Sequence, residues 1–541
     1  MIKVTEQASS AQGTDVTAGL SRDTALVSLC TLLSRITGFV RVVTVAAVLG
    51  SGVLADVYQT ANMIPNLLFE LVAGGVLQAV LVPSYVAARR EGGRAALSEA
   101  TRATSGVIVG GLALVALVGL VLAPVITHIL LLTEQSPTLA HEKTRLMVPM
   151  VLMFIPQLVC YGVATATGAA LNARGRYVAA ALSPAVNNLI VVAACIAFRA
   201  SRHGAVADLD LTPLQFFLIA GGTTLGVVAF SLTPAIALTR AGVKWWPTWN
   251  PQHPAVRTMR ASFGWATLSI VGTLVPTAAA LVLGNGAEGG VAVFVYAFAF
   301  FVLPHALIAV TIATTLAPRV AEGWQSGQTR GVRAAIDGAM KVSVPLLALA
   351  GAGMVALAWP LTRMVASVGQ TASQGLAPIA HTLAAFGPGL LGYGVAFVMI
   401  RVLFALGDVR EASLMTIVGA VVGVVVMTVA SLSMADEQRA AALALGYGAS
   451  QIVAAVLLSS RVYRLTRAMS GSRSTGLLLE SAVAATASWA TMWQVQGLFG
   501  TSRAQAPLAF IAAGVAGVTV FSVMMTLLRG RDMWPRRRSL R

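Results

Sequence analysis

The stretch TALVSLCTLLSRITGFVRVVTVAAVLG, residues 24–50, decides the class of fold. It is apolar over more than the 20 or so residues that a helix needs to cross a bilayer, and its only charged residues are Arg35 and Arg41. An arginine at the centre of a bilayer costs roughly 2.5–3.5 kcal/mol on insertion scales, so two in one span need a compensating partner. A water-filled cavity in which cations meet an anionic substrate would supply one. Arg35 and Arg41 are therefore candidate substrate-binding residues.

The rest of the chain has the composition of an integral membrane protein. Its 541 residues are 57% hydrophobic and only 11% charged, with a mean hydropathy of +0.80, whereas soluble domains carry about 25% charged residues. The first twenty residues lack a basic region followed by an apolar core, so we expect no cleavable signal peptide. The three cysteines, Cys30, Cys160 and Cys195, lie in apolar runs and indicate packing residues, not a disulfide framework or a metal cluster.

About fourteen segments are long and apolar enough to span a membrane. Their approximate cores are 24–49, 56–87, 104–132, 147–171, 178–198, 213–238, 261–284, 290–317, 334–359, 381–406, 412–433, 441–462, 478–498 and 507–528. The loops between them alternate between basic and nearly base-free, which predicts that the basic loops and both termini face the cytoplasm. The net charge of +17 follows from this bias and does not indicate nucleic-acid binding. We expect the basic tail to contact anionic phospholipids.

The two halves of the chain resemble each other, which predicts the domain organisation. MIPNLL around Pro65 resembles VLPHAL around Pro304, and LNARGRY at 171–177 resembles FALGDVR at 404–410 with nearly the same separation. Duplicated halves around a central cavity are common in transporters. We therefore expect an all-α membrane protein with two pseudo-symmetric six-helix lobes and two C-terminal helices. The predicted parts are an N-terminal tail (1–23), an N-lobe (24–240), a C-lobe (241–470), two added spans (471–529) and a basic tail (530–541).

A polar stripe runs along the second predicted span. Its members, spaced by three or four residues and so on one helical face, are Asp56, Gln59, Asn62, Asn66 and Glu70. A polar stripe in a membrane helix should face protein or water. For Gln59 and Asn66 we favour a hydrogen-bonded seam between helices. For Glu70 we favour a functional role, with the carboxylate pairing with one of the two arginines when substrate is absent.

Arginines 35 and 41 are separated by about 240° around an ideal helix, so they can share a face only if the helix bends, for which Gly38 is a candidate. Arg401 lies near the predicted cytoplasmic end of its span, where it can reach the interface. The predicted substrate-binding residues are Arg35, Arg41, Asp56, Asn62, Asn66, Glu70 and Arg401. No HExxH, GxSxG or Walker-type lysine loop is present. We therefore predict a transporter and not an enzyme, without a cofactor, coupled to the membrane potential or to a monovalent cation.

Several motifs resemble the MurJ/MviN family of lipid II flippases in the MOP exporter superfamily. They are SRITGFVR (34–41), GSGVLADVYQTANMIPNLL (50–68), LVPSYVAA (81–88), GAALNARGRY (168–177), SPAVNN (183–188), LPHALIAVTIATTLAPRVAE (303–322) and RVLFALGDVREAS (401–413). The resemblance implies a fourteen-helix fold in the bacterial inner membrane, with a V-shaped cationic cavity and a lipid-facing groove formed by the last two helices. It implies movement of undecaprenyl-pyrophosphate-linked peptidoglycan precursor (lipid II) from the inner to the outer leaflet. Arg35 and Arg41 match family arginines implicated in transport, and Asp56 matches an acid that follows the first span.

The chain also departs from that family at several positions. Val42 replaces an acid, Phe69-Glu70 stands where many members carry arginine, Gly74 replaces a glutamate, and Ala299 replaces an arginine. Two alternatives therefore stay open. One is an exporter of another polyprenyl-linked glycan or of a drug. The other is a transport-inactive scaffold for cell-wall synthesis proteins.

Overall fold

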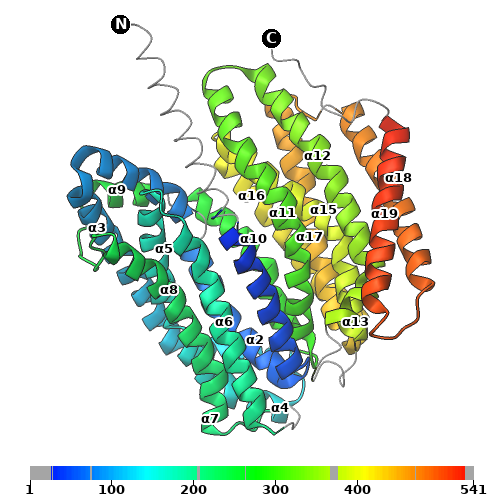
Figure 1. The fold of residues 1–541 in the computed structure, drawn as a ribbon, viewed down its shortest axis with the longest axis horizontal. Helices are drawn as coiled ribbons and strands as arrows, with labels where there is room; N and C mark the ends of the chain where they lie inside the picture. The colour runs from blue at the N-terminus through cyan, green and yellow to red at the C-terminus, as the bar shows by residue number, and fades with distance from the viewer. Residues whose placement is uncertain are drawn as a thin grey trace, which may run out of the picture.

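The computed structural model describes residues 26, 29–73, 76–203, 208–261, 264–365, 369, 376–469 and 471–529. Within these ranges all regular structure is helical, and twelve helices are long and apolar enough to cross a membrane (Figure 1). The predicted all-α membrane class is confirmed. The predicted tails 1–23 and 530–541 lie outside the described residues.

The first half of the chain forms one bundle, which we call the N-lobe. Its elements are the first helix (Leu29–Leu49), α2 (Val53–Ala73), α3 (Val76–Leu130), α4 (Pro137–Phe154), α5 (Gln157–Asn172), α6 (Val178–Ser201), α7 (Pro213–Phe216), the π-helical turn η1 (Phe217–Gly221) and α8 (Gly222–Arg240). A short helix, α9 (Pro254–Ala261), then packs on α3.

The second half forms the C-lobe and two additional helices. The C-lobe comprises α10 (Trp265–Gly284), α11 (Gly290–Gln325), α12 (Thr329–Ala356), α13 (Ala358–Val365), α15 (Ala377–Ala405), α16 (Val409–Ser433), the 3-10 turn η2 (Asp436–Gln438) and α17 (Arg439–Thr466). The added pair, α18 (Gly471–Gly497) and α19 (Ala506–Arg529), lies beside the C-lobe at the edge of the molecule farthest from the N-lobe (Figure 1).

The described residues contain twelve helices that are long and apolar enough to span a membrane, so the expected count of fourteen is not reproduced. The expected segment 56–87 covers α2 and the start of α3, and 478–498 lies in α18. Among the described residues, α2 and α18 do not count as long and apolar enough, whereas α3 does from Val80 onward. The polar stripe of α2 dilutes its apolar character, and α18 carries Arg473, Glu480 and several hydroxyl residues. The expected loop between 87 and 104 is a kink inside α3, where Gly93 has a φ of +64°.

The internal repeat is visible in the turns at one end of the bundle. A residue with positive φ occurs in three N-lobe turns and in the three corresponding C-lobe turns: Gly93, Gly175 and Gly242, and Gly327, Gly407 and Arg467. In the second pair the hydrogen bonding is also the same, since Arg176 N donates to Leu171 O at 3.0 Å and Asp408 N donates to Leu403 O at 2.9 Å. This is the Schellman pattern that ends a helix through a left-handed glycine.

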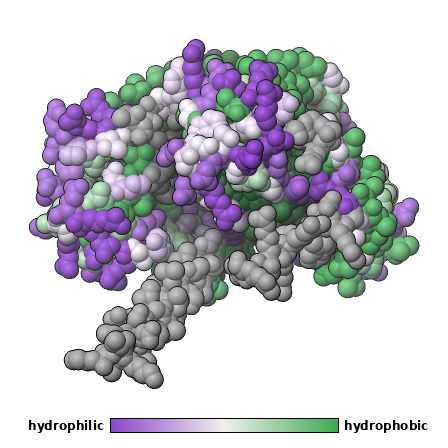
Figure 2. All heavy atoms as spheres, turned by 90° about the horizontal axis from the view of Figure 1, so that it is seen from above, coloured by the Kyte–Doolittle hydropathy of each residue, from purple (hydrophilic) through white to green (hydrophobic). Residues whose placement is uncertain are grey.

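These six turns define what we call the basic end of the molecule. Most of the arginines in the loops lie there, and hydrophilic side chains gather on this end in Figure 2. At the other end, which we call the junction end, the N-lobe and the C-lobe are joined by hydrogen bonds. These bonds run from α2 to the start of α11 and from α4 to Asn285, at the end of α10. The two lobes are therefore attached to each other far from the basic loops.

Candidate functional site

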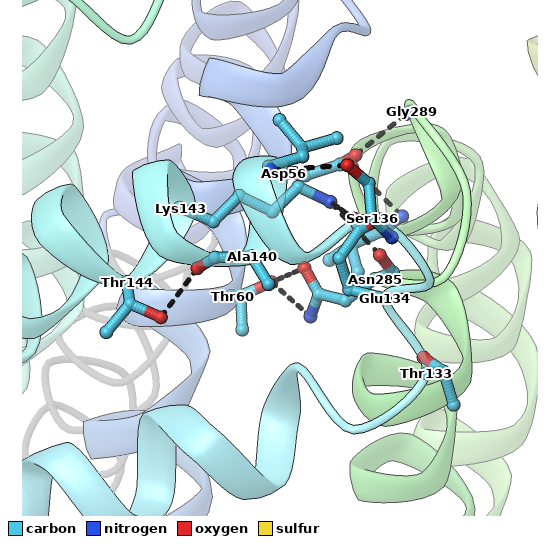
Figure 3. Close-up of polar contacts among 12 residues, drawn as sticks. Asp56, Thr60, Thr133, Glu134, Ser136, Ala140, Lys143, Thr144, Asn285 and Gly289 are labelled. Carbon is cyan, nitrogen blue, oxygen red and sulfur yellow. Dashed lines mark hydrogen bonds and ion pairs between the residues drawn. The ribbon is translucent and has the colours of Figure 1, made fainter.

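Asp56 makes the most extensive polar contact between the lobes (Figure 3). Its side chain is fully buried at the start of α2, and its carboxylate accepts three backbone hydrogen bonds from the start of α11. Gly289 N lies 2.7 Å from Oδ2, while Val291 N and Ala292 N lie 3.1 and 2.8 Å from Oδ1. These amides belong to a helix N-terminus, where unpaired N–H groups and the helix dipole favour an anion. The contact is thus a charge-assisted clamp between the lobes.

Gly289 has the backbone conformation that this clamp requires. Its φ is +76°, and a Cβ at this position would lie only 2.3 Å from Ser51 O, in the turn after the first helix. A non-glycine residue would meet both an unfavourable conformation and a direct clash. Close by, Tyr296 OH donates to Gly50 O at 2.9 Å and adds a second interlobe bond.

A buried lysine, which is not among the predicted site residues, adds a further contact between the lobes. Lys143 of α4 is fully buried, and its Nζ donates to Glu134 Oε2 at 2.6 Å and to Asn285 O of the C-lobe at 3.1 Å. The Asn285 side chain in turn donates to Thr60 Oγ1 of α2 at 3.2 Å (Figure 3). The only signal in the sequence was that Glu134 and Lys143 lie in the gap between the predicted spans 104–132 and 147–171, where charged residues usually need no partner.

The first helix places its two arginines in different surroundings. The helix is continuous from Leu29 to Leu49, so the predicted bend at Gly38 is not present as a break, and the two residues do not share a face. Arg35 is exposed, whereas Arg41 is half-buried in the N-lobe, where its charge acts on Tyr58 of α2 and Tyr161 of α5.

The middle of the polar stripe is packed inside the N-lobe. Asn66 Oδ1 accepts a hydrogen bond from Tyr161 OH at 3.0 Å, and its Nδ2 donates to Asn62 O at 2.8 Å. Gln59 is buried and contacts the hydroxyl of Tyr296 in the C-lobe. The bond from Tyr161 joins α5 to α2 at Asn66, which is the kind of contact that the predicted seam requires. Asn62 is buried as well.

Glu70 and Arg401 are both exposed and lie on opposite lobes. The charge of Glu70 acts on Tyr393 of α15 and Tyr447 of α17, which places it opposite the C-lobe. No ion pair within the described ranges joins Glu70 to Arg35 or Arg41, so the predicted pairing is absent from this conformation. Arg401 lies over the ring of Phe397, with Cζ 5.3 Å from the ring centroid.

A separate apolar groove lies between the C-lobe and the added helices. Its cavity of about 950 Å³ is bounded by α12, α15 and α17 on one side and by α18 and α19 on the other. Apolar side chains dominate the lining, among them Val344, Leu391, Val395, Ile452, Val456 and Leu477. The ion pair between Arg529 Nε and Glu480 Oε2, at 2.6 Å, borders it. A cavity with this lining suits a hydrocarbon chain better than a polar ligand.

Comparison with known proteins supports the same class. The family described as "Lipid II flippase MurJ" matches residues 45–507. A probable lipid II flippase MurJ of Rhizobium meliloti is 26% identical over 392 residues, covering 71% of this chain and 70% of that protein. The lipid II flippase MurJ of Burkholderia cenocepacia is 26% identical over 419 residues, covering 76% and 77%.

Solved structures agree with the fold. "Lipid II flippase MurJ, inward closed conformation" superposes with a TM-score of 0.72 at 16% identity and covers 93% of this chain and 98% of that one. An inward-facing multidrug resistance MATE family transporter of the MOP superfamily has a TM-score of 0.62 at 13% identity and covers 81% and 99%. Since the family match extends over most of the sequence, this chain belongs to the MurJ family of lipid II flippases.

Proposed function

We propose that this chain moves lipid II from the inner to the outer leaflet of the bacterial inner membrane by alternating access, and that the Asp56 clamp is the gate closed in this conformation. The observation that carries the proposal is the interlobe clamp itself. A buried carboxylate on one lobe accepts hydrogen bonds from three backbone amides of the other, so the contact has to break when the lobes separate at this end. Rocking of two lobes around a midplane site is how duplicated transporters alternate access.

The substrate chemistry fits the charges between and beside the lobes. A pyrophosphate is anionic, and the planar guanidinium of arginine matches phosphate oxygens in a bidentate way. We propose that Arg35, Arg41 and Arg401 attract the pyrophosphate, with Asn62 and Asn66 as polar neighbours and Glu70 facing the C-lobe tyrosines. Asp56 has all its carboxylate contacts within the junction, so its proposed contribution to transport is through the gate.

The proposed orientation places the basic end in the cytoplasm, together with both termini. Basic residues in short loops are retained on the cytoplasmic side of bacterial membranes. A periplasm-dependent alkaline phosphatase fused after Arg529 should therefore be inactive, whereas the same enzyme inserted in the loop at 498–505, between α18 and α19, should be active. The opposite pattern would reject this orientation.

The leaflet distribution of lipid II tests the transport function directly. We expect depletion of this chain in its host to trap lipid II in the inner leaflet, and its re-expression to restore lipid II in the outer leaflet. Accessibility of lipid II to an externally added lipid II-cleaving toxin would report both states. If lipid II stays accessible throughout depletion, the chain is not the flippase of that cell.

The apolar groove is the proposed path for the polyprenyl chain. Val456 lines the groove and is 64% exposed, so Val456→Trp should fill it without disturbing the packed interior. We expect this variant to accumulate normally and to lose at least about tenfold of its transport rate, because the indole would occupy the space that the polyprenyl chain needs beside the C-lobe. Val421→Trp, at a residue of α16 that is 56% exposed and outside the groove lining, is the matched control. Equal rates in both variants would place the tail elsewhere.

Drug export is the second candidate function, because the fold is also that of a MATE transporter. The growth phenotype of cells that lack the chain distinguishes lipid II transport from drug export. Loss of a lipid II flippase should cause lysis with accumulation of precursor, whereas loss of a drug exporter should change only drug tolerance.

A further inference from the structure

Four arginines gather at the basic end of the N-lobe. They come from two segments, Arg89 and Arg94 from α3 and Arg174 and Arg176 from the turn between α5 and α6, and we call them the arginine cluster. Burial, together with the neighbouring guanidiniums of Arg176, Arg94 and Arg89, lowers the pKa of Arg174. Like charges held this close repel one another, and a bound anion would relieve the repulsion.

Backbone carbonyl groups hold two members of the cluster in place. Arg89 Nη1 donates to Ala173 O at 3.1 Å, directly beside Arg174 in the chain. Arg174 Nη1 donates to Ala241 O at 2.6 Å. Each bond occupies one N–H of a guanidinium that has five, so the other donors of both groups are available to a further ligand. The positions of these two side chains are thus set by the fold and not by an acidic partner.

In the corresponding turn of the C-lobe, an acidic residue neutralises the nearby arginine. Gly407 corresponds to Gly175, and the next residue is Asp408 where the N-lobe has Arg176. Asp408 Oδ2 accepts from Arg461 Nε at 2.6 Å, so that turn carries its own counter-charge. In the N-lobe, no ion pair within the described part of the chain joins a carboxylate to the cluster, although Glu91 and Glu99 are exposed on α3.

Tryptophans beside the cluster indicate its depth relative to a membrane. Arg94 Nη1 lies 3.0 Å from where a Cβ on Gly242 would stand, and the chain that follows runs along α3, with Thr248 N donating to Arg102 O at 3.0 Å. Trp246 and Trp249 in this segment are 69% and 72% exposed. Exposed tryptophans concentrate at the level of the lipid headgroups. The cluster therefore lies at the depth where lipid phosphates are found.

We propose that the arginine cluster binds the phosphodiester headgroup of an anionic phospholipid from the leaflet at the basic end. The cluster has four guanidiniums, two from each of two segments, and each can present a planar pair of N–H donors to phosphate oxygens. The tryptophans beside the cluster are exposed at the same level. The site is separate from the arginines proposed for transport and does not depend on the transport function.

Binding of a fluorescent short-chain phosphatidylglycerol to the purified full-length chain in detergent tests the site, with phosphatidylcholine as the reference lipid. Replacing Arg174 and Arg176 by glutamine should weaken phosphatidylglycerol binding roughly 25-fold, because each basic residue near an anionic leaflet adds about 1 kcal/mol, or a factor of about five, to the attraction. R319Q/R330Q, which removes two exposed arginines of the same end outside the cluster, should bind like the wild type. Arg176→Gln alone should show part of the loss, and since no hydrogen bond of its side chain is among the described contacts, it should leave the Tm unchanged.

Three results would overturn the proposal. Equal losses in R174Q/R176Q and R319Q/R330Q would indicate general charge attraction without a site. Displacement of the labelled lipid by inorganic phosphate at the same concentration would indicate a site for free phosphate. A cluster variant that loses binding of undecaprenyl diphosphate while keeping that of phosphatidylglycerol would assign the arginines to the transported lipid.

Discussion

Replacing Arg41 by alanine is expected to abolish complementation of a flippase-depleted strain while the protein still accumulates in the membrane. Arg41 is half-buried near Tyr58, Tyr161 and Cys195, and no ion pair of the described residues joins it to a carboxylate. A charge inside a membrane span that has no counter-ion is costly unless function requires it. Since Phe69 and Ala299 stand where relatives are expected to carry arginine, few other cations remain to attract a pyrophosphate.

The effect should be large because hydrogen bonds to charged groups contribute about 1.5–3 kcal/mol each. Losing a bidentate arginine should thus lower the transport rate by two orders of magnitude or more. Arg35→Ala should also lower the transport rate. Arg41→Lys should retain part of the activity, because lysine keeps the charge without the fork. Arg319→Ala, an exposed arginine at the basic end, is the control expected to complement fully. Full complementation by both Arg41→Ala and Arg35→Ala would remove these residues from the mechanism.

Replacing Asp56 by alanine should open the junction. Three amides of α11 lose a charged acceptor, and at about 1.5 kcal/mol for each, partly recovered by water, the closed state should lose on the order of 3 kcal/mol. That loss corresponds to a more than hundredfold fall in the ratio of closed to open molecules. Transport should fall as well, because a gate that does not close cannot alternate.

Electron paramagnetic distance measurements would detect this opening. Spin labels at Thr138 and Glu288, exposed residues on either side of the junction, should shift to a longer and broader distance distribution in Asp56→Ala. The native cysteines would first be replaced by serine. Asp436→Ala removes an exposed acid that pairs with Arg439 three residues along the chain, away from the junction contacts, so the spin-label distances of this variant should match those of the parent. A distance distribution in Asp56→Ala that is the same as in the parent would show that the clamp does not hold the lobes together.

The class of fold and its internal repeat could be predicted from the sequence because hydropathy and glycine placement are local signals. The run at 24–50 and the paired motifs around Gly175 and Gly407 were sufficient for both. The contacts between the lobes could not be predicted in this way. From the sequence alone, Asp56 could equally well line a cavity. The fold is what brings the start of α11 to its carboxylate.

Two further features could be recognised only from the three-dimensional structure. The burial of Lys143 depends on the loop at 285 from the other lobe, more than a hundred residues away in the chain. The charge of Glu70 acts on Tyr393 and Tyr447 of the C-lobe, and no ion pair of the described residues joins it to Arg35 or Arg41. Helical spacing predicts which residues share a face but not which neighbour that face meets.

The Asp56 clamp has a consequence for how this protein can vary. The C-lobe half of the contact consists of peptide N–H groups, which every residue except proline supplies. Residues 291 and 292 can therefore change without losing these bonds only where the new side chain fits their fully buried positions, whereas any side chain at Gly289 meets an unfavourable positive φ. No side chain of the C-lobe can be exchanged to compensate for a lost Asp56. Genetic suppressors of an Asp56 variant should thus arise among the other junction contacts, such as those of Lys143 and Tyr296, and not at the amides that Asp56 binds.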